Sequence, residues 1–293
     1  MKIAVFGNTY RKETLEQVKI LFRVLKERNI FVAVEKSFYD FMTEELCFNP
    51  DVDEIIGESN VVFDLALSIG GDGTFLKTAS FIGDKNIPIL GINTGRLGFL
   101  ADISGDEIEP TIDEILQSRY SIEKRSVLQL CIHQKESETY GYALNEIAVS
   151  KQDSSSMITI HTKIDDVFLN DYQSDGLIVS TPTGSTAYSM SVGGPLVLPQ
   201  SKNLIISAVA PHSLNVRPLV LPDDVQIELS VESRSSCFLI SLDGRSAVMD
   251  KHTKLFIKKA PFHICVLKRE GHTFFNTLRT KLMWGADKRN SSV

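Results

Sequence analysis

The stretch LALSIGGDGTFLKTASF, residues 65–81, joins an apolar run to a helix-like segment through three closely spaced glycines. The run at 65–69, apolar except for Ser68, is typical of a strand buried on both faces of a parallel sheet. Other strand patterns occur at 3–6, 31–34 and 87–92, and helix patterns at 14–28, 39–48 and 74–81. This alternation predicts a Rossmann-like, doubly wound parallel sheet, in which ligands bind beyond the carboxyl ends of the strands.

The pattern changes near residue 120, after a helix predicted at 106–117. Short strand-like runs follow at 127–133, 142–150, 158–163, 177–180, 204–208, 225–231, 237–242, 254–258 and 262–267. Their spacing predicts an antiparallel, β-sandwich-like domain. A final helix at 274–282 places Phe274, Leu278 and Leu282 on one face, so we expect it to pack back on the first domain. The expected domains are therefore an α/β domain at 1–118, a β-rich domain at 119–270, and a returning helix and tail at 271–293.

The composition excludes several classes of protein. The 293 residues carry a formal net charge of −6, and this acidity argues against a protein that binds nucleic acid by neutralising phosphates. No apolar run reaches the roughly 18 residues that span a bilayer, and the first residues lack a leader pattern. The four cysteines form no CxxC pair and the six histidines no HxxxH pair, so no zinc site held by the protein is expected. We expect a cytoplasmic protein with neither a membrane nor a nucleic-acid partner.

The glycines of residues 70–74 allow the backbone to approach a ligand closely, and the helix that follows offers free N–H groups to a phosphate. We predict a phosphate loop formed by Gly70, Gly71, Gly73 and Thr74. Lys77, one turn later, would offset phosphate charge. Asp72 suits this place if it holds a cation or accepts a proton from an attacking hydroxyl; the alternative is an ordinary turn in which Asp72 caps the helix. The Walker A pattern and GxGxxG are both absent.

A second cluster of turn and hydroxyl residues lies in DGLIVSTPTGSTAYSMSVGGP, residues 175–195. An apolar run ends there in a Pro/Gly turn, and serines and threonines lead into an expected helix. Hydroxyls and amides at such a helix start can hold ribose and phosphate oxygens, while Tyr188 can lie against a base. A tight turn with an ordinary cap and a core tyrosine is the alternative.

Asn145 and Glu146 interrupt the apolar run 142–149. An adjacent amide and carboxylate can hydrogen-bond to vicinal ribose hydroxyls. Alternation along a half-exposed strand explains Glu146 equally well. Arg96 either reaches a phosphate or is a surface residue in a glycine loop, and His212 is expected to be structural.

Taken together, the GGDGT loop, the Asn145–Glu146 pair, the 175–195 segment and the closing FFNTLRTKL (274–282) resemble the NAD kinase family in order and spacing. GGDGT alone is shared with phosphofructokinases and lipid kinases. Those families are not expected to carry TPTGSTAYS, so this segment distinguishes the NAD kinase family from them. The resemblance implies transfer of a phosphoryl group from ATP to the 2′-hydroxyl of the adenosine ribose of NAD, giving NADP and ADP.

The resemblance also implies roles for individual residues. Asp72 would be the general base, and the β-rich domain would bind NAD. The implied nucleotide contacts are Asp72, Gly73, Lys77, Asn145, Glu146, Asp175, Thr183, Thr186, Ala187, Tyr188, Ser189, Met190, Ser191 and Ala210. Ser156 and Gln173 stand where some members have a cation, which leaves feedback by NADP(H) open.

The resemblance further implies a homodimer or homotetramer, and Mg²⁺ that arrives with ATP rather than on a metal site of the protein. It leaves the donor open between ATP and polyphosphate. Two other functions stay open at this point, a lipid or sugar kinase with the same loop and a non-catalytic dinucleotide sensor. The hydroxyl-rich second segment favours a nucleotide acceptor, and the presence of Asp72 gives no sign of lost catalysis.

Overall fold

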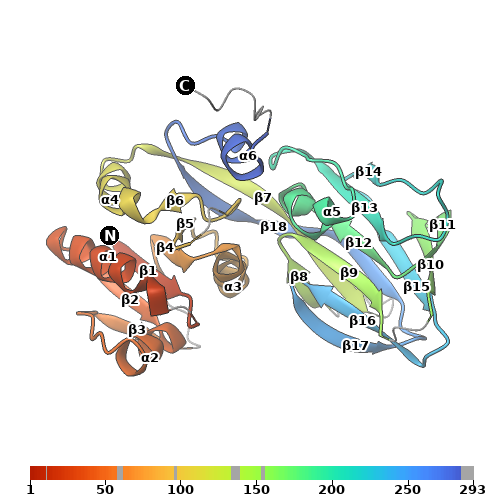
Figure 1. The fold of residues 1–293 in the computed structure, drawn as a ribbon, viewed down its shortest axis with the longest axis horizontal. Coiled ribbons are helices and arrows are strands. Elements are labelled where there is room, and N and C mark those ends of the chain that lie inside the picture. The colour runs from red at the N-terminus through yellow and green to blue at the C-terminus, as the bar shows by residue number, and fades with distance from the viewer. Residues whose placement is uncertain (11, 58–61, 96–97, 133–138, 153–155, 285–293) are drawn as a thin grey trace, which may run out of the picture. The chain divides into compact units, whose positions relative to one another are not determined.

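The computed structural model describes residues 1–10, 12–57, 62–95, 98–132, 139–152 and 156–284. The chain divides into two compact units, Met1–Glu123 with Ile264–Val293 and Lys124–His263. Two long strands, β7 (Tyr120–Ile132) and β18 (Leu255–Arg269), contribute residues to both units (Figure 1).

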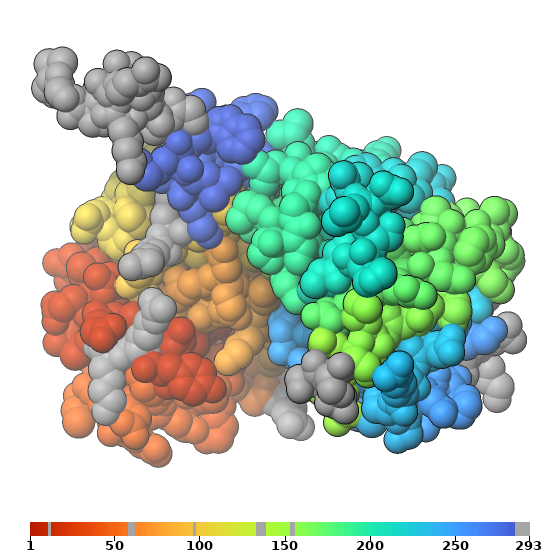
Figure 2. Space-filling view, turned by 45° about the vertical axis from the view of Figure 1, so that its right-hand side comes forward, coloured from red at the N-terminus to blue at the C-terminus, as the bar shows by residue number. Residues whose placement is uncertain are grey.

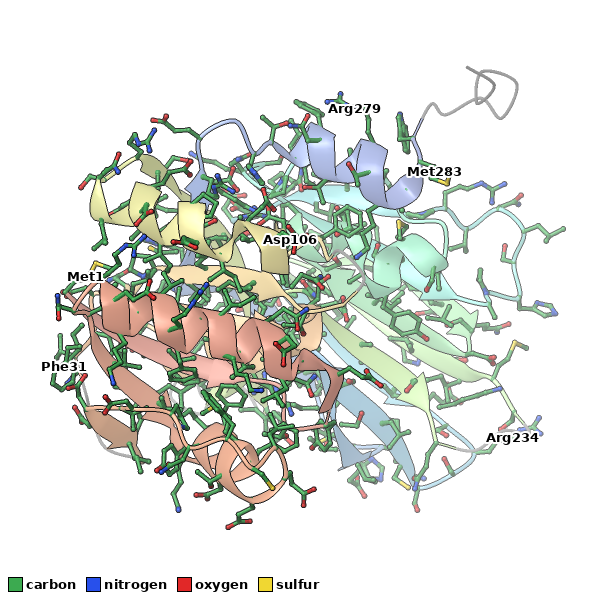
Figure 3. The ribbon with its side chains drawn as sticks, turned by 60° about the vertical axis from the view of Figure 1, so that its left-hand side comes forward. Met1, Phe31, Asp106, Arg234, Arg279 and Met283 are labelled. Atoms are coloured by element: carbon green, nitrogen blue, oxygen red, sulfur yellow. The ribbon has the colours of Figure 1, made fainter. Side chains whose placement is uncertain are left out.

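The first unit contains a parallel sheet with the strand order β3-β2-β1-β4-β5. The strands are β1 (Lys2–Gly7), β2 (Phe31–Glu35), β3 (Glu54–Ile56), β4 (Leu65–Gly70) and β5 (Ile89–Asn93), and β5 also pairs with β6 (Ile103–Ser104). Met1 and Phe31 mark the edge where the parallel β1 and β2 begin (Figure 3), and the Phe31 N–H donates to the Met1 carbonyl at 3.3 Å. The chain moves from β1 out to β3 and returns to the other side of β1, so the topological switch point lies between β1 and β4.

Helices accompany this sheet, and those at 15–27, 36–44 and 108–116 share one hydrophobic core with its strands. The helices are α1 (Leu15–Glu27), α2 (Lys36–Glu44), α3 (Asp72–Ile82), α4 (Ile108–Leu116) and α6 (Phe274–Leu282), with short turns η1 (Lys12–Thr14) and η2 (Gly105–Glu107). Leu21, Phe38 and Ile112 are fully buried among the strand side chains. Helix α2 begins before the predicted residue 39, because the Glu35 carboxylate accepts the N–H groups of Ser37 and Phe38.

The second unit contains two antiparallel sheets. One has the order β14-β13-β12-β9-β16-β17 and the other includes β11-β10-β15-β18. The bounds are β8 (Thr139–Ala143), β9 (Glu146–Lys151), β10 (Ile158–Ile164), β11 (Val167–Ser174), β12 (Gly176–Ser180), β13 (Asn203–Val209), β14 (Leu219–Pro222), β15 (Ile227–Glu232), β16 (Cys237–Leu242) and β17 (Arg245–Asp250). Buried side chains from both sheets form one core, among them Ile160, Leu229, Val179 and Ile240. The predicted fold class, a Rossmann-like sheet followed by an antiparallel β domain, is therefore confirmed.

Several predicted strand boundaries are wrong. The run 142–150 is not one strand, because the chain leaves the extended path at Leu144 and Asn145 between β8 and β9. The runs 254–258 and 262–267 form the single strand β18, which stays extended through Pro261. Strands β3, β6, β11, β14 and β17 were not predicted, since they are short or lie at polar sheet edges.

The four cysteines are all free thiols. Within the ranges given above, no helix has the length and apolar character that crossing a bilayer demands.

Candidate functional site

The glycine loop lies at the carboxyl end of β4, at the topological switch point. The Asn8 N–H donates to the Ile69 carbonyl at 3.1 Å, which brings the end of β1 beside this loop. Gly70 has φ +155, and a Cβ there would lie 2.4 Å from the Thr74 hydroxyl oxygen, so the close turn requires glycine. Helix α3 then begins at Asp72 with Gly71 as its N-cap residue. The predicted phosphate loop is thus a strand-to-helix turn that ends at a helix N-terminus.

The Asp72 carboxylate does not cap α3; it turns towards the chain segment that follows β5. Its Oδ2 accepts the Phe99 N–H at 3.0 Å, and its Oδ1 accepts the N–H groups of Leu100 and Ala101 at 3.0 and 3.1 Å. A Cβ on Gly98 would lie 1.9 Å from Oδ1, so glycine is needed for this close approach. The capping alternative is therefore wrong for Asp72, whose carboxylate is held by three backbone amides.

Lys281 of α6 completes the surroundings of Asp72. Its Nζ lies 3.6 Å from Asp72 Oδ2 and 4.3 Å from the centroid of the Phe99 ring. The Phe274 ring, at the start of α6, lies 6.3 Å from the same Phe99 ring. Figure 3 labels Arg279 on the outer side of α6. Sequence reasoning missed Lys281, because no local pattern relates it to Asp72.

A pocket of about 200 Å³ lies beside the glycine loop within the first unit. Lys77 and Thr74 line it from α3, and Gly7, Thr9 and Glu35 from the ends of β1 and β2. The Lys77 ammonium group lies 5.2 Å from the Tyr10 ring centroid. The predicted basic residue therefore lies at the carboxyl edge of the parallel sheet, one turn into α3.

Asn145 and Glu146 lie where β8 ends and β9 begins. The Asp243 carboxylate accepts the N–H groups of Leu144, Asn145 and Glu146 at 2.6, 2.8 and 3.1 Å, and the Asp243 N–H donates to the Glu146 carbonyl at 3.2 Å. The Asn145 side chain is nearly buried, with 7% of the residue exposed. Sequence reasoning missed Asp243, although an Asp-Gly pair between two strand-like runs is a known hairpin signal.

Thr181 joins this turn to the hydroxyl-rich segment. Its N–H donates to the Asn145 carbonyl at 2.9 Å, and its hydroxyl donates to the Leu144 carbonyl at 2.6 Å and accepts the Gly184 N–H at 3.1 Å. A Cβ on Gly184 would lie 2.1 Å from the Asn145 carbonyl oxygen. The predicted segment and the Asn145–Glu146 pair are therefore brought together by backbone contacts.

The predicted residues of this segment differ in accessibility. They form two short helical turns, η3 (Thr183–Thr186) and α5 (Tyr188–Ser191). Thr186, Ala187 and Met190 are half-buried, whereas Tyr188 is 43% exposed and Ser191 is also exposed. Ser189 is fully buried and its hydroxyl pairs with that of Ser207 at 3.2 Å. The segment, coloured between green and cyan, lies at the surface in Figure 2.

Glu146 Oε2 and Thr183 Oγ1 are among the buried polar atoms of the second unit that lack a hydrogen-bond partner in the described part of the chain. Burial and, to a smaller extent, the negative charge of Asp243 raise the pKa of Glu146 to about 7, while the Tyr188 N–H acts in the opposite direction. Polar groups left without partners in this way are suited to a ligand that supplies hydroxyl or amide donors.

Asp175 and Ala210 lie at the other end of β12 and β13. Asp175 pairs with Lys151 at 2.7 Å, and its N–H donates to the Val209 carbonyl at 3.0 Å. Ala210 follows β13 with φ +45, and the His212 N–H donates to the Gln173 carbonyl at 2.9 Å.

Ser156 and Gln173 line one pocket of about 520 Å³. Lys151 and Arg234 line the same pocket. They supply positive charge there, although positions 156 and 173 lack the cation that some family members have. Arg96 falls outside the described residues. Across the ranges that the structure covers, no three His, Cys, Asp or Glu side chains are grouped to hold a metal ion.

Two family models match the chain. The ATP-NAD kinase N-terminal domain matches residues 3–120, and the ATP-NAD kinase C-terminal domain matches residues 144–265. The NAD kinase of Bacteroides fragilis is 53% identical over 289 residues, covering 99% of this chain and 100% of that protein. The NAD kinase of Cytophaga hutchinsonii is 44% identical over 292 residues, with coverage of 99% and 100%.

Solved structures agree with this likeness. An NAD kinase from Archaeoglobus fulgidus in complex with ATP has a TM-score of 0.75 and 28% identity, covering 97% of this chain and 99% of that chain. A yeast NADH kinase complexed with NADH has a TM-score of 0.90, covering 100% and 90%. At 23% identity the yeast protein shows the fold alone.

Proposed function

Since the chain belongs to the NAD kinase family and phosphorylates NAD to NADP with ATP, we propose that Asp72 is the general base of this reaction. A ribose hydroxyl is a weak nucleophile until its proton leaves. The 2′-oxygen forms a bond to the γ-phosphorus as the bond from that phosphorus to the bridging oxygen breaks. ADP leaves with the electron pair, and the hydroxyl proton passes to Asp72 and then to water.

The observation that carries this role is the way Asp72 is held. A carboxylate has about four acceptor positions, and three are filled by the amides of residues 99–101. Oδ2 accepts a single amide N–H, so it keeps a lone pair beside Lys281. The amides fix the orientation of the carboxylate before substrate binds, which is the positional precision that proton transfer requires.

The donor site is assigned to the same unit. The first N–H groups of α3 and the ammonium group of Lys77 offer positive charge to the phosphates of ATP. Mg²⁺ comes with ATP as part of the substrate and neutralises charge on the transferred group. Gly71 and Gly73 have open space where a Cβ would stand, so a phosphate can approach their amides.

The NAD site is assigned to the second unit. Asn145 and the Glu146 oxygen suit the hydroxyls of a ribose, and Thr183 supplies a buried hydroxyl that, like this oxygen, has no partner among the described residues. The exposed Tyr188 ring is placed to lie against a base. The further residues assigned to NAD are Asp175, Thr186, Ala187, Ser189, Met190, Ser191 and Ala210. The family resemblance supports a homo-oligomer, and four free thiols suit the reducing cytoplasm.

The test is Asp72→Asn in an assay with ATP, Mg²⁺ and NAD, in which NADP is followed through a dehydrogenase that accepts only NADP. We expect kcat to fall about 100-fold or more, on the scale of general-base removal. Thermal unfolding of the variant controls for loss of fold. A loss below about fivefold in a folded variant would overturn the assignment.

A further inference from the structure

The turn between β16 and β17 is a two-residue hairpin formed by Asp243 and Gly244. Leu242 pairs with Arg245 across it, and the two turn residues have φ of +49 and +82. Two positive φ angles in succession are the geometry of a type I′ turn, for which Asp-Gly and Asn-Gly are the favoured sequences. The backbone alone therefore explains Gly244, but it does not require a carboxylate at 243.

The Asp243 carboxylate has a separate function in the structure, because it accepts three successive N–H groups. Oδ2 accepts that of Leu144, and Oδ1 accepts those of Asn145 and Glu146. These amides lie between β8 and β9, where the ladder of strand hydrogen bonds is interrupted. Buried amides without partners are costly, so the carboxylate replaces the missing strand partner at this break.

The same hairpin is tied to the end of β8 a second time. Arg245 donates from Nη2 to the Tyr142 carbonyl at 2.6 Å and from Nε to the Leu242 carbonyl at 3.2 Å. Burial raises the pKa of Asp243, while its three amide hydrogen bonds and then the charge of Arg245 act in the opposite direction. The hairpin thus holds the break from both sides with charged side chains that contact backbone atoms.

We propose that Asp243 is a positioning residue for NAD, which holds the backbone of residues 144–146 so that the side chains of Asn145 and Glu146 face the substrate. The inference rests on the NAD-binding role proposed above for Asn145 and Glu146. Within the described residues, the hydrogen bonds of the Asp243 carboxylate go to backbone amides of this turn, so its effect on NAD passes through that turn.

Asp243→Asn tests the carboxylate without disturbing the hairpin, because Asn-Gly also favours a type I′ turn. An amide side chain keeps one acceptor oxygen and sets an NH₂ group against a backbone N–H. We expect KM for NAD to rise about tenfold or more, with kcat within about threefold and KM for ATP within about twofold, since a lost ground-state contact raises KM.

Asp166→Asn is the matched control. Asp166 lies in another two-residue turn of this unit, between β10 and β11, also at positive φ (+65), and its side chain is exposed. We expect its kinetic constants to equal those of the parent protein. Asp243→Gly, which adopts the same φ without strain, is the second variant if Asp243→Asn unfolds at the assay temperature, and we expect it to raise KM for NAD at least as much.

A pH profile separates positioning from a merely structural effect. Asp243 from the β16–β17 turn and the Tyr188 amide from α5 face Glu146, and Arg245 faces Asp243. Removing the negative charge of Asp243 lowers the pKa of Glu146. The midpoint of KM for NAD against pH should therefore move to lower pH in Asp243→Asn and stay unchanged in Asp166→Asn.

Asn145→Ala distinguishes failure of the positioning role of Asp243 from failure of the proposed NAD site. If Asn145→Ala raises KM for NAD and Asp243→Asn leaves it within twofold, the positioning role fails alone. If Asn145→Ala leaves KM for NAD unchanged, the proposed NAD site fails and takes the inference with it. If both raise it and the double variant is no worse than the larger single effect, the two residues act through one turn.

Discussion

Glu146→Gln is expected to stabilise the ligand-free protein at alkaline pH, although it removes a residue of the proposed NAD site. In the ligand-free protein Glu146 Oε2 is buried and has no hydrogen-bond partner in the described part of the chain. The glutamine side chain has nearly the same shape, carries no charge, and keeps an oxygen that can accept the Tyr188 N–H. The change therefore removes a buried charge and leaves the packing almost intact.

The expected size follows from the pKa of Glu146, which burial and then the charge of Asp243 raise from 4.5 to about 7. At 1.36 kcal/mol per pH unit, this difference corresponds to about 3 kcal/mol of unfavourable free energy when the group is ionised. For a unit of this size, 1 kcal/mol changes Tm by about 3 °C, so Glu146→Gln should raise the Tm of the second unit by about 9 °C at pH 8.

The sign depends on which state binds the proton. Between pH 4.5 and 7 the folded protein keeps Glu146 protonated while the unfolded chain has lost the proton. The free energy of unfolding therefore falls as pH rises through this window and is lowest above pH 7. The advantage of Glu146→Gln should be small at pH 4.5, grow up to pH 7, and then level off.

Calorimetric unfolding of both proteins without NAD, at pH 5 and at pH 8, measures this directly. Asp166→Asn makes the same carboxylate-to-amide change at an exposed turn, and we expect its Tm to differ by less than about 2 °C at either pH, as is usual at surface positions. An equal Tm difference at pH 5 and pH 8, or a less stable Glu146→Gln protein at pH 8, would refute the argument.

Three other predictions concern the reaction itself. If NAD binds only the ionised form of Glu146, KM for NAD should rise about tenfold from pH 8 to pH 6, because one proton is linked to binding. Steady-state kinetics measure this change. Glu146→Gln should remove the pH dependence. Lys281→Met should lower kcat about tenfold, because its ammonium group beside Asp72 offers charge to the transferred phosphoryl group; Arg279→Met on the exposed side of α6 is the control, and equal losses in both would contradict the role. Gly98→Ala should lower kcat at least about 100-fold, because the added Cβ displaces the Asp72 carboxylate and removal of that base lowers kcat by this factor. Gly57→Ala is the control; it has open space for a Cβ and should be active.

The parts of the fold that could be predicted are those with a local pattern. The helix at 274–282 has the predicted bounds, because its apolar residues recur at helical spacing and Thr273 caps it. The glycine loop after 65–69 was also predictable, since a buried parallel strand must be followed by a turn and a helix. Both depend on neighbours in the sequence.

The break at Leu144 and Asn145 could not be predicted in this way. An apolar run with one polar pair fits a half-exposed strand, and the reason that the strand ends lies in Asp243, 98 residues after Asn145. The position of Asp72 depends equally on amides 27 to 29 residues later and on Lys281. Pro261 predicts a strand break because it donates no ladder hydrogen bond, yet β18 continues through it.

The two carboxylates to which we assign roles are held in opposite ways, each within its own unit, and this predicts opposite stability effects for the same chemical change. Asp72 has three of its acceptor positions filled by amides, so an amide side chain there sets donor against donor and should cost about 1–3 kcal/mol. Glu146 has an oxygen with no partner in the described residues, so the same change should stabilise. A base must be oriented before the substrate arrives, whereas a binding group gains most when its partner is the substrate itself. We therefore propose that Asp72 serves the reaction and Glu146 serves recognition.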